Sequence, residues 1–423
     1  MKDVNVGDGG FGITATRMPL ESADLQVAKA QQDLDTARSR RLPKFSLEAQ
    51  AAQLLRPIDV LFNQGAFGTF PSIGPVPATD TSITTGAKPT IVLNAQAAQP
   101  LSQLFRLNVN VRANEATRDV QREELRSGRL EVVKNVKRLY YGILQTESAL
   151  VATDHTISLL GEINRTVDER LLRRVVLRSD SLASSARLAE AEHTRLTLRH
   201  TLASRKEQLN QLLGRDVRTA FETAGPPAPS ILEADADAAL AHALDTRPDI
   251  TQARLRLRQA ELARRAARAD SIPDVSLALS YLSPMNIEGA PRNITSLALQ
   301  LQWEPFDWGR RGRTVATRDL EITQARNALR DAEDRAVLGI NASYRRVEEA
   351  RSQMRVASAT QEAARETARV RANQFRVQAV LLSDVLSAEA NQANADNQYQ
   401  QALLALWQAR ADYEHALGQE VTQ

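Results

Sequence analysis

Histidine and cysteine are the residue types most often found in metal and nucleophilic sites, and this chain of 423 residues has five histidines and no cysteine. The histidines are scattered along predicted helices, without a paired-ligand spacing such as HExxH. The glycine cluster GDGGFG at 7–12 follows no predicted strand and lacks the Gly-Lys-Ser/Thr of a phosphate-binding loop. We therefore expect no catalytic residue, no metal site and no cofactor. The histidines are His155, His193, His200, His242 and His415.

Charge and hydropathy exclude further classes of protein. The 54 basic and 51 acidic residues nearly balance, which argues against a nucleic-acid partner. No stretch approaches the length of uncharged apolar sequence that a transmembrane helix needs. The opening MKDVNVGDGGFG lacks the apolar core of a signal peptide. We expect residues 1–18 to form a flexible leader and the chain to be a mature or trimmed form.

A Ser-Asp pair occurs twice before an alanine-rich stretch, as SDSLAS at 179–184 and SDVLSA at 383–388, and a glycine follows each at the same distance, Gly214 and Gly418. Ser and Asp side chains accept hydrogen bonds from the free amides at a helix start, and glycine is favoured where a helix ends. The spacing therefore predicts two helices of equal length that begin with Ser-Asp N-caps and end at the glycines.

Long stretches around both pairs contain no proline, from 101 to 225 and from 306 to 423. Apolar residues recur there at spacings of three, four and seven, which predicts helices packed as coiled coils. The sequence thus predicts two helical hairpins. The first spans 101–213 with its turn near 174–180, and the second spans 306–418 with its turn near 377–384.

Alternating apolar and polar residues predict four β-strands, near 43–56, 88–99, 273–284 and 293–304. Gly/Pro-rich connections at 56–88 and 283–291 join the strands in pairs. The chain is then an internal duplication. A first repeat at 19–213 opens with a short helix, a connector occupies 214–246, a second repeat covers 247–418, and 419–423 form a tail.

Four amphipathic strands are too few to close a pore, whereas a transmembrane β-barrel built by several chains needs strands with one apolar and one polar face. Aromatic residues cluster where the last strand gives way to a helix, as in an interfacial belt, and arginines suited to phospholipid head groups follow them. The alternative is that these residues only cap and solubilise a helix start. They are Trp303, Phe306, Trp308, Arg310 and Arg311.

Four segments, in their order along the chain, resemble signatures of one family: LNQLLGRD at 209–216, RPDITQARLRLRQAELARRAARADSIPDVSL at 247–277, WEPFDWGRRGRTVATRDL at 303–320 and LSDVLSAEANQANA at 382–395. With them, the chain from about residue 20 to 418 resembles the TolC-like outer-membrane efflux proteins. The resemblance implies a mainly α fold with a membrane β-barrel. Each chain of a homotrimer would give four strands to a 12-stranded barrel and its helices to a 12-helix periplasmic tunnel, with 214–246 in an equatorial belt.

The same resemblance implies a function without enzymatic activity. The protein would be the outer-membrane exit duct of a tripartite efflux pump, with a periplasmic adaptor and an inner-membrane transporter as partners and outer-membrane lipid around the barrel. A type I protein-secretion duct is an alternative, because the partner pump sets the substrate. A periplasmic adaptor or a soluble coiled-coil scaffold explains less, since neither accounts for two hairpins each preceded by a pair of strands.

The resemblance places adaptor contacts at the two hairpin turns. The turns of the family carry a glycine shortly before the Asp, where this chain has Arg174 and Gln378. Asp180 matches the aspartate of a lock at the periplasmic mouth, but its partner positions fall at Phe375 and Val380, so that lock cannot form. We expect Asp180 and Arg174 to line the mouth. The expected contact residues are Val175, Val176, Leu177, Arg178, Ser179, Asp180, Ala379, Val380, Leu381, Leu382, Ser383 and Asp384.

Overall fold

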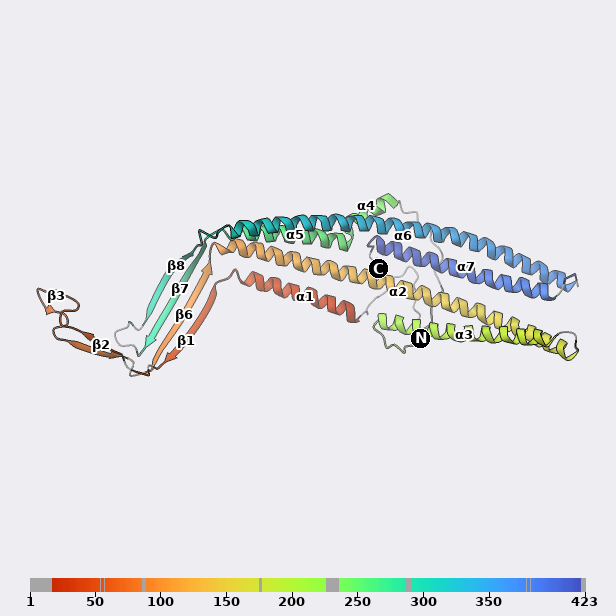
Figure 1. Ribbon diagram of the computed structural model, residues 1–423, viewed down its shortest axis with the longest axis horizontal. Coiled ribbons are helices and arrows are strands. Elements are labelled where there is room, and N and C mark those ends of the chain that lie inside the picture. Colours follow the sequence, from red (N-terminus) through yellow and green to blue (C-terminus); the bar gives the residue numbers. More distant parts are fainter. Residues whose placement is uncertain are drawn as a thin grey trace. The chain divides into compact units, whose positions relative to one another are not determined.

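The structure is a computed structural model that describes residues 17–53, 55–56, 58–85, 89–174, 177–225, 236–286, 291, 293–377, 379–380 and 382–419. It is mainly helical, with one four-stranded sheet and two small β-ribbons (Figure 1). The chain divides into two compact units. The first comprises Met1–Ala28, Asp119–Leu255 and Arg326–Gln423, and the second comprises Lys29–Arg118 and Arg256–Ala325. Within the described ranges, no helix is both long enough and apolar enough to cross a membrane.

The four-stranded sheet lies in the second unit, and its strands follow the predicted segments. Every neighbouring pair is antiparallel. Pro43 and Pro273 stand immediately before two of the strands, where a proline removes no ladder hydrogen bond. The strands, in spatial order, are β1 (Lys44–Ala52), β6 (Thr90–Pro100), β7 (Asp274–Met285) and β8 (Ile294–Gln302).

The connection between β1 and β6, expected only as a Gly/Pro-rich loop, contains two antiparallel ribbons. One pairs β2 (Ile58–Phe62) with β5 (Thr81–Thr85), and the other pairs β3 (Thr69–Phe70) with β4 (Gly74–Pro75). These strands have two to five residues each, too short for a periodic pattern to stand out among glycines and prolines. The sequence pattern therefore did not predict these ribbons.

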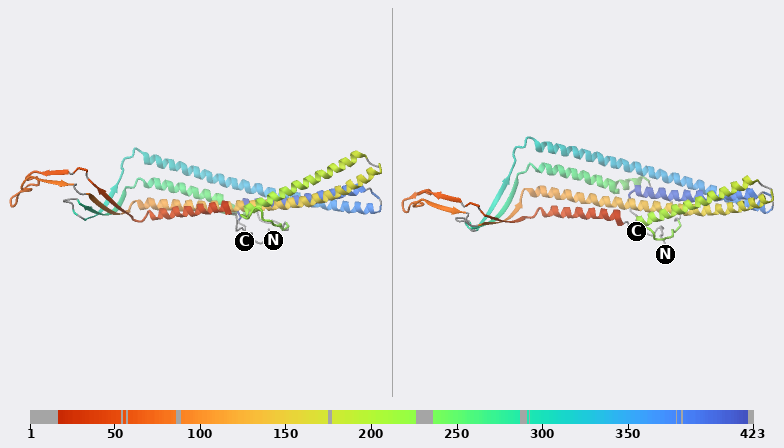
Figure 2. Two further views of the ribbon diagram at one scale, coloured as in Figure 1. Left: turned by 90° about the horizontal axis from the view of Figure 1, so that it is seen from below. Right: turned by 60° about the horizontal axis from the view of Figure 1, so that its bottom comes forward.

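Long helices pair side by side as the proline-free stretches predict. Figures 1 and 2 show α2 (Gln103–Leu172) beside α3 (Arg178–Leu212), and α6 (Arg310–Arg376) beside α7 (Leu382–Ala416). The shorter helices are α1 (Arg17–Ser39), α4 (Ala236–Thr246) and α5 (Pro248–Ala269). Because α1 begins at Arg17, the last two residues of the expected leader are helical. The expected connector contains α4.

Both returning helices end at the predicted glycines. Gly214 and Gly418 have φ values of +65° and +68°, a left-handed conformation that a side chain disfavours. The amide of Arg215 donates to the Asn210 carbonyl at 2.9 Å, and the amide of Gln419 donates to the Glu414 carbonyl at 3.3 Å. These bonds satisfy carbonyls that the helix end leaves free. The prediction of glycine stops is confirmed.

The core of the first unit gathers most of its large side chains where α2, α3 and α7 meet the segment 215–225. Tyr141 and Trp407 stack with ring centroids 6.1 Å apart. The Tyr140 hydroxyl donates to the Ala224 carbonyl at 2.7 Å, and burial raises the pKa of Tyr140 to about 12. The protein therefore anchors the start of its connector to the middle of the long helices. Buried members include Val136, Ile143, Leu209, Phe221 and Leu404.

Candidate functional site

The strand register gathers apolar side chains on one face of the sheet. Phe45 of β1 pairs with Ala97 of β6, which pairs with Leu279 of β7 and through it with Leu297 of β8. Paired residues share a face, so this row is apolar across all four strands. Phe45 is 77% exposed and Leu297 is 69% exposed. The large side chains of this apolar face are Phe45, Leu47, Ile91, Leu93, Leu277, Leu279, Leu297, Leu299 and Leu301.

The opposite face of the sheet is largely polar. The hydroxyls of Ser280 and Ser296 lie 2.7 Å apart across the β7–β8 pair. The strand register therefore keeps the alternation found in the sequence, with apolar side chains on one face of the sheet and largely polar side chains on the other. Polar residues on this face are Ser46, Glu48, Gln50, Asn94, Gln96, Ser280, Ser296, Gln300 and Gln302.

Three exposed aromatic side chains occupy the turn from β8 into α6, as the sequence predicts. They are Trp303, Phe306 and Trp308, of which Trp308 is 88% exposed. The rings of Phe306 and Trp308 meet edge to face at 5.9 Å. Trp308 (φ +57°) and Gly309 (φ +80°) are both left-handed, which turns the chain sharply into the helix. An interfacial role for these rings stays a prediction.

Asp307 caps the start of α6. Its carboxylate accepts hydrogen bonds from the amides of Gly309 at 3.1 Å and Arg311 at 2.9 Å. The bond from the Arg311 amide is the main reason why the pKa of Asp307 lies below its usual value. The first turn of α6 is thus held by a side chain that sequence reasoning did not single out.

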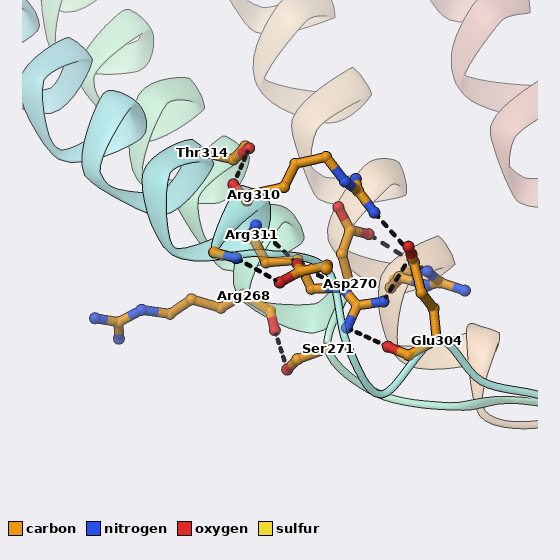
Figure 3. Close-up of polar contacts among 10 residues, drawn as sticks. Arg268, Asp270, Ser271, Glu304, Arg310, Arg311 and Thr314 are labelled. Carbon is orange, nitrogen blue, oxygen red and sulfur yellow. Dashed lines mark hydrogen bonds and ion pairs between the residues drawn. The ribbon is translucent and has the colours of Figure 1, made fainter.

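Arg310 and Arg311 both bind Glu304 (Figure 3). The Glu304 carboxylate lies 2.8 Å from the Arg310 guanidinium and 3.3 Å from that of Arg311. Arg311 also donates to the Glu304 carbonyl at 2.7 Å. Both arginines therefore link the first turn of α6 to Glu304. Their contact with phospholipid head groups stays a prediction.

A second polar cluster, around Arg106, holds the junction where β6 enters α2 and α5 enters β7. Arg106 pairs with the carboxylates of Asp270, at 3.3 Å, and Asp274. The Ser102 hydroxyl accepts from the Val275 amide at 2.8 Å and donates to the Pro273 carbonyl at 2.7 Å. Sequence reasoning missed this cluster. The sequence feature that could have indicated this cluster is an acidic residue next to a proline at the end of a strand, as in Pro273-Asp274. The same feature occurs in Glu304-Pro305.

The first hairpin turn lies between Leu172 and Arg178, whereas the sequence places it near 174–180. Val175 and Val176 fall outside the described residues, and Leu177 is 71% exposed. The expectation that Ser179 and Asp180 cap α3 from outside is wrong, because α3 begins at Arg178 and both residues lie in its first turn. The Asp180 side chain is not among those described.

Arg174, expected at the mouth, is exposed and has φ +62°. Its amide donates to the Leu171 carbonyl at 2.9 Å, closing the end of α2. The chain thus makes a left-handed turn here with an arginine, although glycine is the residue that favours this conformation. Whether Arg174 and Asp180 line a periplasmic mouth stays a prediction.

The second hairpin turn lies between Arg376 and Leu382. The Ala379 amide donates to the Gln374 carbonyl at 2.9 Å, which closes the end of α6, and Val380 is half-buried. Here too the helix begins before the Ser-Asp pair, so Ser383 and Asp384 are not external N-caps. Leu381 and the side chains of Leu382 and Ser383 fall outside the described residues.

Solved structures of outer-membrane channels are similar to this chain over most of its length. The Campylobacter jejuni CmeC outer membrane channel matches with a TM-score of 0.77 at 16% identity, over 94% of this chain and 82% of that one. The outer membrane protein VceC of Vibrio cholerae matches at 0.74 and 16%, over 94% and 92%. The Neisseria gonorrhoeae MtrE outer membrane channel matches at 0.73 and 17%, over 94% and 85%. The chain therefore has the fold of these outer-membrane channels.

The family follows from the sequence. A family model described as outer membrane efflux protein matches residues 14–215 and 239–419. The chain belongs to the outer membrane efflux protein family, which confirms the resemblance carried by its motifs. No curated protein sequence matches the chain.

Proposed function

We propose that this protein is the outer-membrane exit duct of a tripartite efflux pump, formed by three copies of the chain. The observation that carries the proposal is the sheet with one exposed apolar face and one polar face. Such a sheet fits a barrel wall with lipid outside and water inside. The pump's inner-membrane transporter would supply the energy, and the duct would conduct passively.

The strand directions support closure by copies of the chain. In the sheet order β1-β6-β7-β8 every pair is antiparallel, so β1 and β8 run in opposite directions. The β8 edge of one copy can therefore pair with the β1 edge of the next in the same antiparallel manner, and three copies would give twelve strands. The two hairpins, whose returning helices have 35 residues each, would give twelve helices to a tunnel in the periplasm. They would be the duplicated halves of each chain.

Paired arginine substitutions on adjacent residues of β8 test the barrel. Leu299 lies on the apolar face and Gln300 on the polar face. Leu299→Arg should impair insertion into lipid vesicles, because a charge facing the middle of a bilayer costs about 2–4 kcal/mol. Gln300→Arg, the matched control, should insert and change the ion selectivity of the channel in planar bilayers. A native chain that stays monomeric and water-soluble would refute the proposal.

The hairpin turns are the proposed contacts for the periplasmic adaptor. Leu177 is exposed there, and the Val and Leu residues expected from the sequence at the two turns of each chain would form an apolar patch suited to a partner. Asp180→Ala with Asp384→Ala should weaken adaptor binding in a pull-down while light scattering still shows a trimer. Glu190→Ala, an exposed acid on α3 away from the turn, is the control. Unchanged adaptor binding would mean that the Ser-Asp elements only build the turns.

A further inference from the structure

One face of the β2–β5 ribbon carries three exposed apolar side chains, next to Thr81 and Thr85. The register pairs Val60 with Ile83 and Ile58 with Thr85. Val60, Ile83 and Ile58 are exposed by 40%, 44% and 52%. We call the surface formed by Ile58, Val60 and Ile83 the ribbon face. The opposite face carries Asp59, Ser82 and Thr84, together with Leu61.

Within the two described strands, 58–62 and 81–85, the ribbon face carries no charged side chain. Between residues 58 and 85 the sequence has two charged residues, Asp59 and Asp80. Asp59 accepts a hydrogen bond from the Thr84 hydroxyl on the opposite face, and Asp80 accepts one from the Gln64 amide at 2.7 Å. Both carboxylates are therefore directed into the ribbon's own hydrogen bonds. Identical ribbons could approach each other through the ribbon face without charge repulsion.

The segment beyond the ribbon is held by its own hydrogen bonds. The Phe67 amide donates to the Val76 carbonyl, and the Val76 amide donates to the Gly68 carbonyl, both at 2.9 Å. The rings of Phe62 and Phe67 lie 5.1 Å apart. A two-stranded ribbon is only marginally stable alone in water, so a defined ribbon with an exposed apolar face needs cover.

We infer that the ribbons of neighbouring copies pack on one another through the ribbon face. This inference rests on the proposed trimeric duct. The ribbon follows β1 in the chain after five residues, and β1 is an edge strand of the sheet. In the proposed barrel that edge meets the next copy, and all three ribbons leave from the same rim, the one opposite the helices. A neighbouring copy is thus the partner nearest to the ribbon face.

Engineered cysteines test the inference directly, because the chain has no cysteine of its own. Val60→Cys places one thiol on the ribbon face, and Ser82→Cys places one on the opposite face. Each variant carries a single thiol, because thiols at the cross-strand partners Val60 and Ile83 would be linked within one ribbon. After treatment of the detergent-solubilised trimer with a short thiol cross-linker, the first variant should give several-fold more covalently linked dimer than the second. Equal linking on both faces, or none on the ribbon face, would overturn the inference.

A second pair of variants asks whether the contact contributes to assembly. Val60→Asp with Ile83→Asp places like charges on the ribbon face, and Ser82→Asp is the control on the opposite face. The first variant should still assemble, because the barrel remains, but its trimer should dissociate at a lower temperature than the control. Light scattering separates the two hypotheses. A trimer without ribbon cross-links overturns only this inference, whereas a monomer overturns the proposed duct and the inference with it.

Discussion

Lys137 of α2 donates a hydrogen bond to the Glu414 carboxylate of α7 at 2.6 Å, across 277 positions of sequence. Arg410 binds the same carboxylate at 2.9 Å. Both Lys137 and Glu414 are largely buried, beside the stacked rings of Tyr141 and Trp407. This ion pair ties the returning helix of the second hairpin to the outgoing helix of the first.

Lys137→Met should destabilise the protein. The substitution leaves the largely buried Glu414 carboxylate with Arg410 as its remaining cation among the contacts described above. Removing one partner of a buried hydrogen bond lowers the free energy of unfolding by about 1–3 kcal/mol. Denaturant unfolding in detergent measures the change. The matched control is Arg335→Met, which breaks the exposed pair with Asp331 on α6 and should change little. Equal effects in the two variants would contradict the structural role of the Lys137–Glu414 pair.

Arg174→Gly should stabilise the first hairpin turn. A non-glycine residue with φ near +60° costs about 1–2 kcal/mol in the folded state. Part of that gain is lost to the greater freedom of glycine in the unfolded chain, which leaves a net gain of about 0.5–1 kcal/mol. The control is Arg173→Gly, at a residue without a positive φ, which should destabilise. Thermal unfolding of both variants measures the difference, and a loss of stability in Arg174→Gly would count against the left-handed turn.

Stability should fall in mild acid because of His415. Burial is the main reason why the pKa of His415 lies below its usual value, and the positive charges of Lys134 and Arg247 lower this pKa further. The carboxylates of Glu131, at 3.2 Å, and Asp412 act in the opposite direction. The folded state therefore prefers the neutral ring. At a pH above the pKa of His415 in the unfolded chain, this preference does not change the stability. As the pH falls below that pKa, the unfolded chain binds a proton that the folded chain does not, and the free energy of unfolding decreases.

Melting temperatures between about pH 7.5 and 5 test this prediction. His415→Gln should remove part of the decrease seen on acidification. His193→Gln, at an exposed histidine of α3, is the control and should retain the full decrease. Identical pH profiles for the two variants and the native chain would contradict the prediction.

Asp307→Ala should loosen the first turn of α6. The substitution removes the acceptor for the amides of Gly309 and Arg311, two donors that a helix start leaves unpaired. Hydrogen exchange should accelerate at these amides while the sheet exchanges as before. Asp331→Ala, at an exposed acid further along α6, is the control. Unchanged exchange at Gly309 and Arg311 would show that the cap does not hold the turn.

Local features of the sequence predicted most of the elements. Alternation located the four sheet strands, and the proline-free stretches with Gly214 and Gly418 located the long helices and their ends. The same reasoning placed the Ser-Asp pairs outside the helices, although α3 and α7 begin one residue earlier. A helix boundary depends on hydrogen bonds across the turn, and these cannot be read from two side chains alone.

The sequence by itself determined which residues are apolar, at which period they recur, and where glycine and proline interrupt them. Those properties are local, because a period of two or of 3.6 is fixed by the geometry of a single strand or helix. Only the tertiary structure decided which partners meet: Arg106 with Asp274, Lys137 with Glu414, and the rows of side chains that make one sheet face apolar. These contacts join residues far apart in the chain, and they depend on strand register and helix packing, which the local pattern leaves open.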